Sequence, residues 1–195
     1  MKIILASQSP ARAELLKTLG VKDFKIIPSG INEEAQKNEK PRDLAKRLAK
    51  EKALKTLEQF SNDELIISAD TVASIGTRSL GKASSEGDVQ YFLEKLSGRR
   101  HKLYTGICVA RASDKKLRLR VVKTEIKLKR LSSEEILWYA KTGEGIGKAG
   151  GYSIAGKFQA LSPMISGQVS NVIGLPLFDL KNMLESFDYR ITNLD

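Results

Sequence analysis

The sequence predicts an α/β fold built around a mixed sheet. Strand-like and helical segments alternate along the 195 residues, and two long strand-like segments at 100–112 and 117–130 predict an antiparallel hairpin. An apolar content of 41% and a charged content of 29% are typical of a globular chain that buries a core. We therefore expect one domain that spans residues 1–195.

The first half of the chain predicts two strands and two helices. The apolar segment 2–6 predicts a strand, and Ser9 is a good N-cap for a helix at 10–19 that begins with proline. A strand at 24–28 precedes a polar turn and a long helix at about 41–60, which also begins with proline.

The chain from residue 64 onward predicts a further strand, the hairpin, three helices and a glycine-rich loop. A strand at 64–69 runs into Asp70 and a further extended stretch. Two serines with an acid three residues later have the spacing of a capping box. The remaining elements are a helix from Ser85 to Leu96 with Asp88 in the box, a helix from Ser132 to about 142 with Glu135 in the box, a glycine-rich loop at 143–151, short strands, and a last helix from Pro176 to about Phe187.

The turn between the first strand and the first helix is a candidate anion site. Residues 7–11 (SQSPA) would aim free backbone N–H groups and the positive helix end at one point, which suits a phosphate. Arg12, in the first helical turn, can add a fork of donors. The alternative is an ordinary capped helix that binds nothing.

Two acidic positions are candidates for catalysis or metal binding. Asp70 follows the apolar strand, and the carboxyl end of such a strand is where α/β sheets place ligands. Its carboxylate could orient a water as a base or bind a divalent metal, and the alternative is a plain turn residue. Glu33, in the loop after the second strand, could complete an oxygen-ligand Mg²⁺ site.

Two lysines are candidates for phosphate contacts. Lys82 follows a glycine in a short loop ahead of a helix, where it could reach a phosphate. Lys52 lies on a face of the long helix, where lysines are more often solvated than functional.

Net charge and cysteine content indicate which classes of partner and which cellular compartment to expect. The net charge of +10 fits either a solvated, lysine-rich surface or attraction to nucleotide phosphates or nucleic acid. The basic residues of 115–130 alternate with apolar ones, as on the wet face of a strand, and lack the aromatics of a single-strand stacking platform. A lone cysteine, no secretory signal and no run of about 18 apolar residues indicate a cytoplasmic protein without a membrane span.

Two further motifs do not qualify as catalytic signatures. Residues 145–150 match G-x-G-x-x-G, but they follow a helix rather than a strand, so we reject a dinucleotide fingerprint. The loop instead suggests a flexible lid or a close approach to a ligand. His101, the sole histidine, lacks a nucleophile elbow as a partner and is expected to be structural.

Nine segments, in order over nearly the whole chain, carry a resemblance to a known family. They are residues 5–12 (LASQSPAR), 31–33 (INE), 48–53 (LAKEKA), 68–72 (SADTV), 80–82 (LGK), 96–101 (LSGRRH), 105–106 (TG), 147–152 (GKAGGY) and 170–177 (SNVIGLPL). These segments resemble the signatures of the Maf proteins, nucleoside triphosphate pyrophosphatases once described as septum-formation inhibitors. Ala83 stands where the family has a proline.

The resemblance implies an elongated, twisted mixed sheet flanked by helices, with two lobes and a cleft between them. It implies hydrolysis between the α and β phosphates of a nucleotide, a divalent cation (Mg²⁺ or Mn²⁺) and a homodimer. The implied roles are Asp70 as the base or metal-bound activator of water, Glu33 as a metal ligand, Lys52 and Lys82 as phosphate contacts, and Ser7, Ser9 and Arg12 as the lining of the anion site.

Three positions bear on which base is read. The branch of the family that acts on dTTP and UTP has arginine and glutamine where this chain has Ala11 and Ala155, whereas Thr71 matches it. The branch that acts on 7-methyl-GTP has an aromatic residue and a glutamate at the first two of these positions, and this chain has neither. Because two alanines enlarge the pocket and remove hydrogen-bond partners, we expect relaxed or shifted base preference.

Three functions compete at this stage. The first is a house-cleaning pyrophosphatase that removes non-standard or excess nucleotides. The second is a regulatory or nucleic-acid-binding protein of the same fold, linked to cell division, against which the carboxylates of Glu33 and Asp70 argue. The third is a hydrolase of short modified nucleotides.

Overall fold

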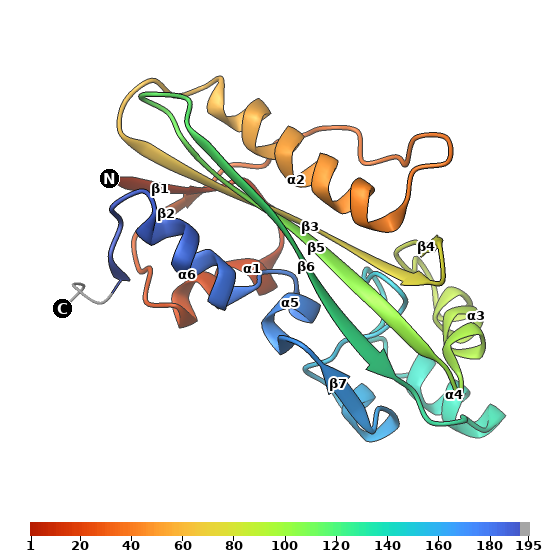
Figure 1. Cartoon of the computed structure of the whole chain (residues 1–195). Helices are drawn as coiled ribbons and strands as arrows, with labels where there is room; N and C mark the ends of the chain where they lie inside the picture. Colours follow the sequence, from red (N-terminus) through yellow and green to blue (C-terminus); the bar gives the residue numbers. More distant parts are fainter. Residues whose placement is uncertain (192–195) are drawn as a thin grey trace.

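A seven-stranded mixed sheet forms the centre of the computed structural model, which describes residues 1–191 (Figure 1). The strand order is β2-β1-β3-β5-β6-β7, and β4 pairs with β3 off this path. The strands are β1 (Lys2–Leu5), β2 (Phe24–Ile26), β3 (Glu64–Ile75), β4 (Arg78–Leu80), β5 (Arg100–Arg111), β6 (Leu117–Lys127) and β7 (Met164–Ser166). Pairs β1–β2 and β1–β3 are parallel and the others antiparallel, so the predicted α/β fold with a mixed sheet is confirmed.

Helices cover both faces of this sheet. They are α1 (Pro10–Thr18), α2 (Pro41–Leu57), α3 (Glu86–Leu96), α4 (Ser133–Ala140), α5 (Val169–Ile173) and α6 (Leu177–Glu185), with a 3₁₀ turn at Lys157–Leu161. Figure 1 shows α2 along one face of the long strands, α1 and α6 on the other, and α3 and α4 at the far end. Within residues 1–191, no helix is long and apolar enough to cross a membrane.

The apolar side chains form four clusters, two of them beneath α2 and two toward opposite ends of the long strands. At one end, Leu16 of α1 and Leu180 of α6 pack on the sheet face opposite α2. At the other end, Leu93 of α3 and Tyr139 of α4 pack with Phe158. The long strands β3 and β5 contribute to both of these end clusters and so hold the two ends together.

Local signals placed most element ends correctly. The Ser9 side chain accepts a hydrogen bond from the Arg12 backbone N–H, and Pro10 begins α1. The capping box at the start of α4 is complete. At the start of α3 only half of the predicted box forms, because the Asp88 carboxylate accepts from Ser84 instead of closing on Ser85.

The expectation that Asp70 ends a strand is wrong. Asp70 lies in the middle of β3, because pairing with β5 continues on one side of β3 from Leu65 through Ser74. On the other side, β1 ends opposite Ile67 and β4 joins only at Ala73. Between these points, this edge of β3 has no strand partner within residues 1–191, and the gap opens at the carboxyl end of β1.

Candidate active site

A pocket of about 550 Å³ opens at this gap in the sheet edge. Segments that are far apart in the sequence form most of its walls. They are the β1–α1 turn (6–12), the loop after β2 (28–31 and 33), Lys52 of α2 with Asp70 and Thr71 of β3, Lys82 with the glycine-rich loop (147–149), and the stretch 152–155 with Val172 and Ile173 of α5. All ten predicted site residues line this one pocket.

The β1–α1 turn and Arg12 form one corner of the pocket. The Arg12 guanidinium donates to Ser7 Oγ at 3.1 Å, to Thr71 Oγ1 at 3.4 Å and to the Gly174 carbonyl at 2.9 Å. Burial lowers the pKa of Arg12, while the negative charges of Asp70 and Glu33 oppose this shift. Arg12 thus joins α1, β3 and the end of α5 and places a fixed positive charge beside the helix N-terminus.

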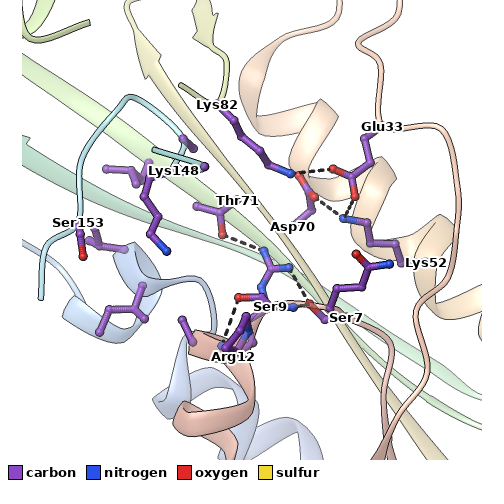
Figure 2. A pocket seen from close by; sticks show the side chains of 18 of the residues that line it. Ser7, Ser9, Arg12, Glu33, Lys52, Asp70, Thr71, Lys82, Lys148 and Ser153 are labelled. Carbon is purple, nitrogen blue, oxygen red and sulfur yellow. Dashed lines mark hydrogen bonds and ion pairs between the residues drawn. The ribbon is translucent and has the colours of Figure 1, made fainter. Parts of the chain in front are cut away.

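Two carboxylates and two lysines form the opposite corner (Figure 2). Lys52 Nζ lies 2.6 Å from Asp70 Oδ1 and 2.7 Å from Glu33 Oε1, and Lys82 Nζ lies 3.1 Å from Glu33 Oε2. Lys52 and Asp70 are buried, so the alternative of a solvated helix face for Lys52 is wrong. Burial raises the pKa of Glu33, but the hydrogen bonds and charges of Lys52 and Lys82 outweigh it and lower this pKa to about 2.

The glycine-rich loop at 143–151 is fastened to the chain around Lys82. Gly147 N–H donates to the Ala83 carbonyl at 2.7 Å, and Gly150 N–H donates to the Gly81 carbonyl at 3.0 Å. A Cβ on Gly145 would overlap the Gly151 carbonyl oxygen, so the loop folds tightly on itself. No helix begins in or directly after this loop, which agrees with rejecting a dinucleotide fingerprint. The backbone hydrogen bonds argue against a flexible lid.

Two buried side chains hold the pocket wall at 152–155. His101 Nε2 and Tyr152 Oη share a hydrogen bond of 2.6 Å, and the Tyr139 hydroxyl accepts from Ser153 N–H at 2.9 Å. Tyr152 stacks on Phe158 with ring centroids 3.9 Å apart. His101 is therefore structural, as expected, and burial lowers its pKa to about 4 against a weaker opposing effect of Glu125.

Sequence reasoning gave no role to several residues that support the site. Thr105 Oγ1 lies 3.0 Å from Thr71 Oγ1 and donates to the Asn171 carbonyl, so hydrogen bonds continue inward from Arg12 through the partly buried Thr71 to the buried Thr105. Lys148 of the glycine-rich loop also lines the pocket. The only signal for them is their place in the TG, GKAGGY and SNVIGLPL segments.

Comparisons with known proteins bear on this arrangement. The family described as "Maf-like protein" matches residues 2–187. The chain is 45% identical to a protein of Rickettsia felis named nucleoside triphosphate pyrophosphatase, over 99% of this chain and 96% of that protein. A protein of the same name from Rickettsia rickettsii is also 45% identical, over 100% of this chain and 91% of that protein.

The chain belongs to the Maf family. Its fold is also shared with a HAM1 protein from Coxiella burnetii, with a TM-score of 0.53 and 18% identity over 95% of this chain and 99% of that protein. The predicted Maf and ITPase-like fold is thus confirmed by the sheet order and by this likeness.

The three positions that the resemblance links to base preference lie at the same pocket of this Maf protein. Ala11, Thr71 and Ala155 all line it, and Thr71 is held by Arg12 and Thr105. Neither alanine side chain can offer a hydrogen bond to a base edge.

Proposed function

We propose that the chain hydrolyses nucleoside triphosphates between the α and β phosphates, releasing a nucleoside monophosphate and pyrophosphate. The observation that carries this is the meeting of a helix N-terminus, Arg12, two lysines and two carboxylates in one pocket large enough for a nucleotide. The names of the relatives support the same activity.

Asp70 is the proposed base. Its carboxylate is buried at the sheet edge and Lys52 lies against one oxygen, so the second oxygen remains available to accept a proton from water. Lys52, Lys82 and Arg12 would stabilise the negative charge that moves onto the leaving pyrophosphate. The α1 N-terminus, with Ser7 and Ser9, would hold the polyphosphate in register.

The donor set suits Mg²⁺ or Mn²⁺. Within residues 1–191 there is no group of three or more His, Cys, Asp or Glu residues that could hold a metal ion by themselves. Mg²⁺ commonly binds through one or two carboxylates together with substrate phosphates and water, and Glu33 and Asp70 supply two such carboxylates. A divalent cation bound there would neutralise charge on the polyphosphate.

The test is product identity across a nucleotide panel. The purified chain is incubated with natural and modified nucleoside triphosphates, with Mg²⁺ or Mn²⁺, and the products are separated by ion exchange. We expect equal amounts of monophosphate and pyrophosphate. The Asp70→Asn variant measures the background hydrolysis that does not depend on the proposed base. Release of diphosphate and orthophosphate would contradict cleavage at the α–β bond.

The nucleic-acid-binding alternative is not favoured. Arg118 and Arg120 are exposed on β6, as the alternation predicted, but Arg120 pairs with Asp179 at 2.8 Å. Carboxylates at the phosphate pocket would weaken a binder of nucleic acid and suit a hydrolase. The homodimer and the cytoplasmic location remain predictions.

A further inference from the structure

One positively charged side chain of the pocket, that of Lys148, has no part in the roles proposed above. Lys148 lies in the glycine-rich loop, its side chain is exposed, and it lines the pocket. Figure 2 shows it on the Ser153 side, across from Glu33 and Lys52.

The ion pairs of the pocket separate its lysines into two kinds. Lys52 and Lys82 are both held by carboxylates at 3.1 Å or less. Lys148 makes no ion pair within 4.0 Å with any acidic residue of 1–191. Four cationic side chains and two carboxylates therefore line the pocket, and the positive charges of Arg12 and Lys148 are not matched by a paired carboxylate.

The backbone places Lys148 in a fixed relation to Lys82. The Lys148 carbonyl accepts from Ala83 N–H at 3.2 Å, and Lys82 and Ala149 form an isolated antiparallel bridge. Gly147, which precedes Lys148, has φ +76°, a conformation that favours glycine. The loop thus presents Lys148 from a backbone that is hydrogen-bonded to the neighbouring segment around Lys82.

We propose that Lys148 is a substrate-binding residue that contacts the polyphosphate of the nucleotide from the side opposite Lys52. The Lys148 ammonium makes no ion pair with the acidic residues that the structure describes, and the pocket carries excess positive charge. A negatively charged phosphate group complements such a site better than a neutral base edge does. This inference rests on the proposed function, because it names a contact to the same nucleotide.

The test measures binding rather than turnover, by calorimetry at low salt. The probes are inorganic tripolyphosphate, which has no base, and a nucleoside α,β-methylene triphosphate, which resists cleavage at the α–β position. We expect Lys148→Met to weaken binding of both probes about tenfold, and Lys148→Arg to recover most of the loss. Lys141→Met, at an exposed lysine outside the pocket lining, should leave both affinities within twofold.

Two results would overturn the inference. One is tripolyphosphate binding by Lys148→Met within twofold of the unmodified chain. The other is a loss confined to the nucleotide analogue, which would place Lys148 at the nucleoside. Because tripolyphosphate binding does not depend on hydrolysis, failure of this inference is distinguishable from failure of the proposed activity. Thermal unfolding of each variant checks that the fold is retained, as expected for an exposed side chain.

Discussion

Lys52 Nζ and Asp70 Oδ1 lie 2.6 Å apart, and this contact joins α2 to the middle of β3. Both residues are buried, and Glu33 approaches the same ammonium from the loop after β2. Three segments thus meet at one nitrogen atom. The same ion pair therefore contributes to the stability of the fold and positions the carboxylates of the pocket.

Asp70→Asn should leave a folded protein whose turnover is at least about a hundredfold lower, because the amide cannot act as a general base. Pyrophosphate release under saturating nucleotide measures the change. Asp43→Asn, at an exposed aspartate in the first turn of α2, is the matched control and should retain turnover. Turnover near that of the unmodified chain would remove Asp70 from the proposed role.

Lys52→Met should lower the free energy of unfolding by roughly 3–5 kcal/mol, because it leaves the buried Asp70 carboxylate without its cation. Denaturant unfolding at pH 7 measures this. Adding Asp70→Asn to Lys52→Met should recover part of the loss, since the unpaired charge is then gone. A double variant that is less stable than Lys52→Met would contradict the ion-pair explanation.

The unfolding free energy should fall as the pH decreases from about 6.5 to about 4, in part because of His101. Its pKa is lowered from 6.5 to about 4 in the folded state by burial, so in this window the unfolded chain binds the extra proton. The effect of one such group is at most about 3 kcal/mol. His101→Gln should flatten this part of the pH profile, and an unchanged slope would show that other groups cause it.

Gly106→Ala should destabilise the protein by about 2 kcal/mol or more, because the added methyl group would overlap the Ala45 carbonyl oxygen of α2. Thermal and denaturant unfolding measure the loss. Gly76→Ala is a useful comparison for strain without contact, since that glycine has φ +57° and no atom within 4 Å of an added Cβ. Equal losses at the two positions would argue against close packing of α2 on β5.

A nucleotide panel should show relaxed or shifted base preference, because Ala11 and Ala155 offer no side-chain hydrogen bonds at the pocket. Comparing kcat/KM across natural and modified nucleoside triphosphates measures preference independently of overall rate. Strict selectivity for dTTP and UTP would be the contrary result. Ala155→Gln should shift preference toward dTTP and UTP, because it restores the glutamine that the dTTP and UTP branch has at this position.

The sequence by itself determined the elements whose signals are local. Ser9 and Pro10 begin α1, and Ser132 with Glu135 begins α4, because a cap forms between residues three apart in the chain. The hairpin of β5 and β6 could also be predicted, because its two strand-like segments follow each other closely in the chain. Every candidate site residue that was named from the ordered motifs also lines one common pocket.

Only the tertiary structure decided how those residues meet. The position of Asp70 within β3, rather than at its end, depends on pairing with β5, some 36 residues away at Gly106. The burial of Lys52 depends on two carboxylates from other segments, and the attachment of the glycine-rich loop depends on backbone partners at 81–83. Such contacts join residues that are distant in the chain, so no local pattern of residues specifies them.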